Sequence, residues 1–128
     1  MIGTEVQKAI FDALSGAPAI ADGRVYDLVP REAAFPYVTI GDEQALDDGN
    51  ACDDGWEVFA DVHVWSRSVG YPEAKGLMAK IVPRLTGISA IAGYTLIAVE
   101  LESSRIFRDG DGLTSHGVIT IRFVITPA

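Results

Sequence analysis

Apolar residues recur at helical spacing in two segments of the chain. From Thr4 to Leu14 they fall at i, i+3, i+4, i+7 and i+8, which predicts an amphipathic helix. Thr4 is a favourable N-cap, and Gln7 three residues later predicts a capping box. The same spacing predicts a second helix from Tyr71 to Leu85. Pro83 removes a backbone donor near its end, so we expect a kink or an early end near Val82.

Other segments alternate apolar and polar residues or are rich in β-branched and aromatic side chains, which predicts strands. In the short first strand we expect Val25 and Leu28 to point inward. The strongest alternation lies between Trp56 and Ser66, where the more polar face still carries Phe59 and Trp65, so this face is a plausible interface. The predicted strands are Gly23–Pro30, Pro36–Gly41, Trp56–Ser66, Tyr94–Phe107 and Gly117–Thr126.

The order of these elements predicts the fold class. Helices and strands do not alternate strictly, so the pattern favours an α+β fold with a mixed or mainly antiparallel sheet and two helices packed on one side. With 128 residues and no internal repeat, the chain is predicted to form a single domain over residues 1–128.

Residues 42–55 form a marked break in composition. They hold six of the eighteen acidic residues and no basic one, which predicts a long, mobile, solvated loop. The chain as a whole carries a formal net charge of −8, and its ten basic residues are scattered singly. Because phosphate binding requires clustered Lys and Arg, the sequence argues against a protein that grips nucleic acid.

Candidate metal and catalytic residues are few. Neither His63 nor His116 has a ligand partner three or four residues away, so each is expected to be structural or solvent-facing. The run Asp109-Gly-Asp111-Gly lacks the spacing of a calcium loop, which leaves only weak divalent binding open. Ser115 and His116 are adjacent and so point apart, and no nucleophile elbow is present. We therefore expect no enzyme, no metal site and no cofactor.

Three further features define the expected setting of the protein. Cys52 is the sole cysteine and is predicted to be an incidental exposed thiol. Glu100 and Glu102 are expected on one strand face, as solvent-facing charges or partners in salt bridges between subunits. No apolar run approaches the roughly 18 to 20 residues of a membrane span, and the N-terminal residues lack the pattern of a signal peptide, so we expect a cytosolic protein without membrane association.

The segment from Gly23 to Gly41, GRVYDLVPREAAFPYVTIG, carries a resemblance to a known family. With the elements that follow it, the chain resembles the small tail-completion or tail-terminator proteins of long-tailed bacteriophages and phage-derived particles such as prophages and gene transfer agents. The matching positions are Gly23, Arg24, Val25, Tyr26, Pro30, Phe35, Pro36, Tyr37, Gly41 and Trp65, and most are expected to maintain the fold.

The resemblance implies a structural protein of the virion, assembled in the host bacterial cytoplasm. Such proteins form a ring, usually a hexamer, on the last disc of the tail tube, end its growth and present a docking surface to the head connector. The resemblance thus implies a homo-oligomer that meets the tail tube protein and a connector or stopper protein. DNA is expected to pass through the lumen without specific binding, since an acidic wall repels phosphates.

Two loops are the candidate interfaces because loops on rigid elements commonly carry contacts. One is the acidic loop with Asp47, Asp48, Asp53 and Asp54; the other is the predicted hairpin tip with Arg108, Asp109, Asp111 and His116. Three alternatives remain open: another neck component such as a connector or stopper, a tail tube subunit, and a cytosolic small-molecule-binding or enzymatic α+β domain.

Overall fold

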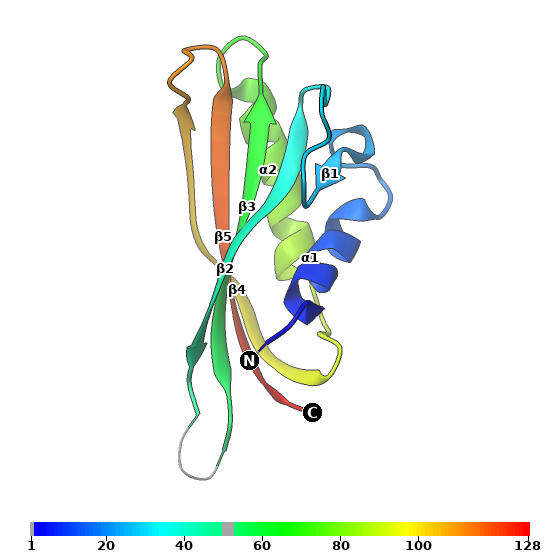
Figure 1. The fold of residues 1–128 in the computed structure, drawn as a ribbon, viewed down its shortest axis with the longest axis vertical. Helices are drawn as coiled ribbons and strands as arrows, with labels where there is room; N and C mark the ends of the chain where they lie inside the picture. The colour runs from blue at the N-terminus through cyan, green and yellow to red at the C-terminus, as the bar shows by residue number, and fades with distance from the viewer. Residues whose placement is uncertain (1, 50–52) are drawn as a thin grey trace.

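The computed structural model describes residues 2–49 and 53–128, and these form one α+β domain (Figure 1). A five-stranded sheet in the order β1-β2-β3-β5-β4 carries both helices on one face. β1 runs parallel to β2, and the remaining neighbours are antiparallel. The elements are α1 Glu5–Ser15, a 3-10 turn Ala21–Gly23, β1 Val25–Tyr26, β2 Tyr37–Asp47, β3 Trp56–Ser66, α2 Pro72–Thr86, β4 Tyr94–Arg108 and β5 Ser115–Pro127. The predicted fold class is confirmed.

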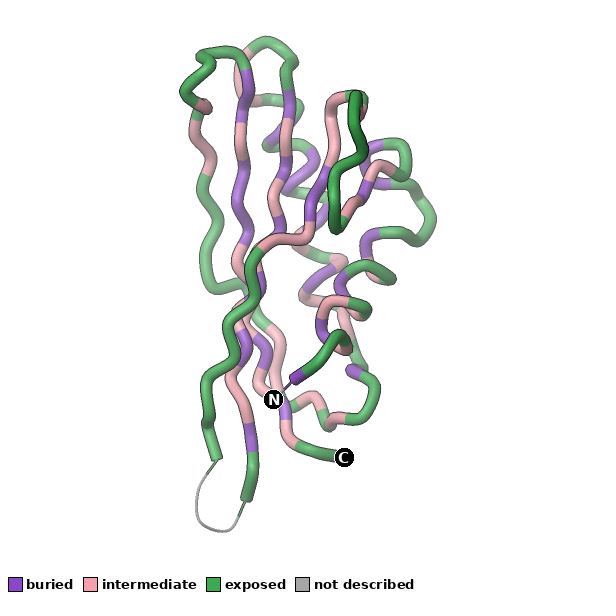
Figure 2. The backbone as a smooth tube through the Cα atoms, viewed as in Figure 1, coloured by how far each residue is buried: buried purple, intermediate pink, exposed green. Residues whose placement is uncertain are grey.

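The core lies between the helices and one face of the sheet (Figure 2). The stripe predicted on α2 is buried from Ala74 to Leu85, and α1 buries Val6, Ile10 and Leu14. Alternate residues of the central strands β3 and β5 point toward the helices and complete the core. The opposite face of these strands carries no helix (Figure 1). The core residues of these strands are Val58, Ala60, Val62, Val64, Ile119, Ile121, Phe123 and Ile125.

Two predictions about the N-terminal third are wrong. Thr4 precedes α1, but its side chain makes no capping hydrogen bond; only its carbonyl joins the helix, by accepting from the Lys8 amide at 2.8 Å. The predicted capping box is therefore absent. β1 ends at Tyr26 because it pairs with only two residues of β2, and Leu28 is 89% exposed instead of pointing inward.

The predicted break at Pro83 is also wrong, since α2 continues to Thr86. Proline removes only one donor this close to the helix end, and the burial of Leu85 holds the last turn against the sheet. The Gly87 amide closes the helix by donating to the Pro83 carbonyl at 3.0 Å.

The predicted loop over residues 42–55 is wrong for its first part. β2 runs through it to Asp47, and its register with β3 shifts between Ile40 and Glu43. The outer half of β2 extends beyond the core, so solvent reaches both of its faces. Its residues therefore do not alternate between apolar and polar, and the sequence pattern did not predict a strand there. Cys52, predicted as an incidental exposed thiol, lies outside the described residues.

Candidate interaction surfaces

The outer halves of β2 and β3 form a ribbon that projects beyond the helices, and we call residues 43–49 and 53–59 the acidic arm (Figure 1). Strand pairing continues as far as Asp47 and Trp56, and the Asp48 amide then donates to the Gly55 carbonyl at 2.9 Å. Four of the predicted interface residues are exposed at its end, namely Asp47, Asp48, Asp53 and Asp54. The arm thus presents clustered carboxylates on a hydrogen-bonded support.

The turn between β4 and β5 lies at the opposite end of the molecule (Figure 1). The carboxylate of Asp111 accepts hydrogen bonds from the Thr114 amide at 2.9 Å, the Thr114 hydroxyl at 2.7 Å and the Leu113 amide at 2.8 Å. These bonds, those from Thr114 above all, lower the pKa of Asp111 to about 2. Asp111 therefore fixes the turn, while the side chain presented to solvent is Leu113, which is 70% exposed.

This turn is tied to the loop between β3 and α2, and we call residues 67–71 and 109–114 together the apex. The Arg67 guanidinium donates to the Thr114 hydroxyl at 3.2 Å. The guanidinium of Arg108 lies 4.7 Å from the ring centre of Tyr71. Val69 at the loop tip is 96% exposed. The apex is a cross-linked pair of loops that displays apolar side chains.

His116, predicted at the hairpin tip, instead lies on β5, on the sheet face without helices. Its Nε2 lies 2.7 Å from Nδ1 of His63, and its ring stacks on Trp65 with centroids 3.8 Å apart. Nδ1 of His116 is 3.4 Å from a carboxylate oxygen of Asp109. Burial lowers the pKa of His116, and His63 lowers it further, whereas Asp109 opposes the shift. The two facing ring nitrogens are close enough for one hydrogen bond, in which the tautomers decide which ring donates.

The predicted interface residues thus fall into three places. The four arm aspartates lie together. Asp111 lies in the apex at the opposite end, and Arg108, the last residue of β4, lies over the apex ring of Tyr71 (Figure 1). His116 and Asp109 belong to the histidine cluster. Sequence reasoning expected His63 and His116 each to be structural or solvent-facing, and it did not foresee their contact. The only available signal was the alternation that placed His63 and Trp65 on one strand face.

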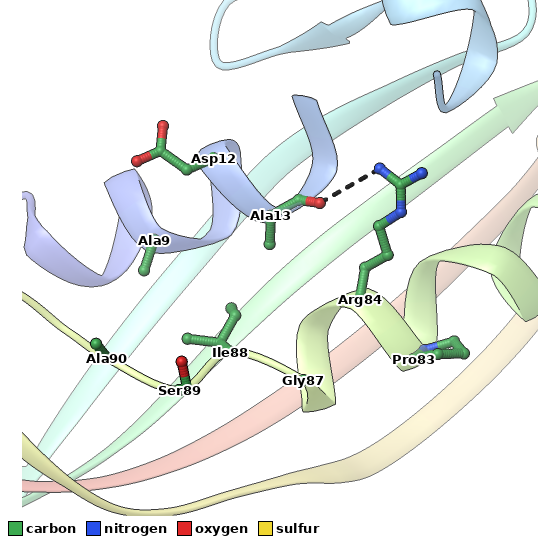
Figure 3. A pocket seen from close by; sticks show the side chains of 9 residues that line it. All are labelled: Ala9, Asp12, Ala13, Pro83, Arg84, Gly87, Ile88, Ser89 and Ala90. Atoms are coloured by element: carbon green, nitrogen blue, oxygen red, sulfur yellow. Dashed lines mark hydrogen bonds between the residues drawn. The ribbon is translucent and has the colours of Figure 1, made fainter. Parts of the chain in front are cut away.

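A groove of about 510 Å³ separates α1 from the end of α2 and the chain that follows it (Figure 3). Small side chains line most of it, and its one carboxylate, Asp12, binds the ammonium group of Lys8 at 2.6 Å. Arg84 on its rim points to the carbonyl of Ala13. Within residues 2–49 and 53–128, no three His, Cys, Asp or Glu side chains are placed to hold a metal ion. None of the helices in this part of the chain is long and apolar enough to cross a membrane.

Comparison with known proteins agrees with the fold. Over 94% of its length the chain is 28% identical to the tail completion protein gp17 of Bacillus phage SPP1, of which it covers 91%. The solved structure of SPP1 gp17 superposes with a TM-score of 0.63 over 94% of this chain and 88% of that one. A chain of the virion of a native gene transfer agent particle is 20% identical and has a TM-score of 0.86, over 94% and 93% of the two chains. The family model described as tail completion protein gp17 matches residues 8–126, and the chain therefore belongs to this family of tail completion proteins.

Proposed function

We propose that this protein is a structural component of a phage-type tail. Its copies form a ring, as a hexamer, that closes the tail tube. The observation that carries the proposal is the family match over residues 8–126. The likeness in fold to a chain of an assembled gene transfer agent virion supports a place within a particle. The ring covers the growing face of the tube and so ends polymerisation, and its other side receives the head connector or stopper.

The two ends of the elongated subunit suit such a role because they differ in chemistry. The acidic arm ends in four exposed aspartates, whereas the apex displays Val69 and Leu113 on loops fixed by hydrogen bonds. One end meets the tail tube and the other meets the neck component. The net charge of −8 keeps a passing DNA duplex from binding to the wall of the ring.

The first test is electron microscopy of particles produced by a strain that lacks the gene. Variable, overlong tails without heads are the expected result, because nothing then stops the tube. Tails of normal length lying beside filled heads would instead identify a connector or stopper. Unchanged, infective particles would refute a role in the virion and return the enzyme or small-molecule-binding hypotheses to consideration.

The second test reverses charges on the arm. Asp48→Lys combined with Asp54→Lys should abolish capping while the subunit still folds, because both side chains are exposed. The control is Asp22→Lys with Glu32→Lys, which alters the net charge by the same amount at two exposed acids outside the arm; Asp22 lies in the 3-10 turn, 3.6 Å from Arg24, so the fold of the control is checked by its thermal unfolding. Retained tail-length control in the arm variant removes the arm from the docking surface.

A further inference from the structure

The edge strand β4 is interrupted at two positions. Its register with β5 shifts between Leu96 and Ala98 and again between Leu101 and Ser103, so Ile97 and Glu102 have no partner across the ladder. Bulges redirect side chains and make an edge a poor template for another strand. Ile97 is 60% exposed at the first shift. This edge therefore presents an apolar side chain for packing, and its irregular backbone disfavours strand addition.

The opposite flank of the sheet contains a hollow. α1 lies over β1 and β2, and between α1 and the chain that follows β1 there is a cavity of about 300 Å³. Phe11 forms its apolar wall and is 42% exposed; the remaining lining residues are Thr4, Gln7, Lys8 and Asp27. Leu28 follows directly and is almost fully exposed. This flank has the shape and polarity to accept an aliphatic side chain.

Exposed apolar side chains concentrate on these two flanks. Of the eight large hydrophobic residues exposed in the described chain, two lie on β4 and three lie on the flank of α1 and β1. The first two are Ile97 and Leu101, and the other three are Phe11, Leu28 and Val29. Two different apolar flanks on opposite sides of one subunit are what a head-to-tail contact between identical copies requires.

We propose that the β4 edge of one copy docks against the α1 flank of the next copy, with Ile97 entering the hollow beside Phe11. The inference rests on the ring of the proposed function and assigns its lateral contact. One charge on each side can take part: Glu102 on the β4 edge makes no ion pair among the described residues, and the exposed ammonium of Lys8 at the rim of the hollow holds Asp12 of its own helix at 2.6 Å and has further N–H donors for a carboxylate of the next copy. Asp27 is the one acidic residue that lines the hollow, so the apolar contact of Ile97 carries the docking. Repetition of this contact around a closed rotation generates the ring without any residue from another protein.

Cysteine cross-linking tests the contact in the full-length chain. Ile97→Cys and Leu28→Cys are introduced together in a Cys52→Ser background, and both the purified protein and the assembled particles are oxidised. The expected product is a ladder of disulfide-linked oligomers that ends at the ring number. Replacing Ile97→Cys by Leu113→Cys, at the exposed apex, should give no ladder. Absence of the ladder in both preparations, or efficient linkage of Ile97→Cys to itself, overturns the proposal.

A second variant separates loss of docking from loss of folding. Ile97→Asp should weaken self-association about thirtyfold, in the range typical of a buried interface anchor, with unchanged thermal unfolding of the subunit. Leu113→Asp is the matched control and should leave association unchanged. Overlong tails in the deletion strain without a cross-linked ladder would refute this contact and leave the proposed function standing. A cross-linked ladder, together with tails of normal length in the deletion strain, would refute the proposed function and leave the lateral contact standing.

Discussion

Replacing Arg84 by glutamine should destabilise the subunit through the contact between its two helices. The Arg84 guanidinium reaches from α2 to three backbone carbonyls at the end of α1 and just after it. Figure 3 shows the one to Ala13, in the last turn of α1. It donates to Gly16 at 2.8 Å, to Ala13 at 3.5 Å and to Pro18. Carbonyls at a helix end have no partner within the helix, so the guanidinium replaces the water that would otherwise solvate them. Glutamine is shorter and uncharged, and it cannot serve all three.

The magnitude follows from these bonds. A hydrogen bond from a charged donor contributes roughly 1.5 to 3 kcal/mol when it is buried. Two of the three contacts of Arg84 are exposed and the longest is weak, so we expect a total loss of about 2 kcal/mol. For a chain of 128 residues, the average unfolding entropy converts this loss into a decrease in Tm of about 7 °C.

Urea unfolding followed by tryptophan fluorescence measures the loss, because Trp56 and Trp65 are both partly buried. All variants are compared at one protein concentration, since assembly would add to apparent stability. Lys80→Gln is the control: it removes a cation from the same helix, but from a side chain that makes no hydrogen bond among the described residues. Arg84→Lys should fall between the two, because it keeps the charge and loses the forked geometry. An Arg84→Gln variant as stable as Lys80→Gln would refute the reasoning.

Three further variants test close packing and titration. Gly41→Ala should cost about 1 to 3 kcal/mol in urea unfolding, since a Cβ there would lie 2.5 Å from the His63 ring; Gly76→Ala on α2 meets no atom within 4 Å and should be neutral or stabilising. Partial desolvation of this exposed side chain, and secondarily the carboxylate of Glu5 on α1, raises the pKa of Glu43, so its ionisation opposes folding. Glu43→Gln should therefore raise Tm at pH 7 and lose this advantage near pH 4, where both states are protonated; an equal advantage at both values would contradict the assignment. The pKa of His116 is lowered, so the unfolded chain binds the proton more readily and wild-type stability should fall as pH drops below about 6.5. His116→Gln should flatten this part of a Tm against pH profile, and an unaltered slope would show that another group causes it.

Local sequence patterns predicted most of the fold because the core elements obey them strictly. The strand Trp56–Ser66 was predicted with its observed bounds, and the α2 stripe from Ala74 to Leu85 is buried as expected. Errors arose where tertiary contacts outweigh local preference. Pro83 stays helical because burial of the next turn holds it, and β2 extends to Asp47 because β3 offers a partner strand outside the core.

The candidate surfaces were less predictable, since they depend on register. Pairing of Trp65 with His116 across β3 and β5 brings two histidines into contact that are separated by 53 positions. No periodicity specifies that pairing. The exposure of Ile97 depends on a shift in the β4 ladder, which a strand pattern also does not encode. Asp111 was correctly placed in a turn, but its three internal hydrogen bonds show that a charged loop residue can be occupied by its own backbone.

The distribution of chemistry over the subunit separates two kinds of contact within the proposed ring. Apolar side chains such as Ile97 and Leu28 lie on the flanks, where a contact repeated between identical copies has to persist. The acidic arm instead carries exposed charge, and such contacts form quickly by electrostatic steering but are screened by salt. A ring held by apolar flanks can remain closed while its acidic end engages and releases a partner. The proposed sequence of capping followed by docking requires such a separation, and the side chains exposed on the sheet edges and on the acidic arm are distributed in keeping with it.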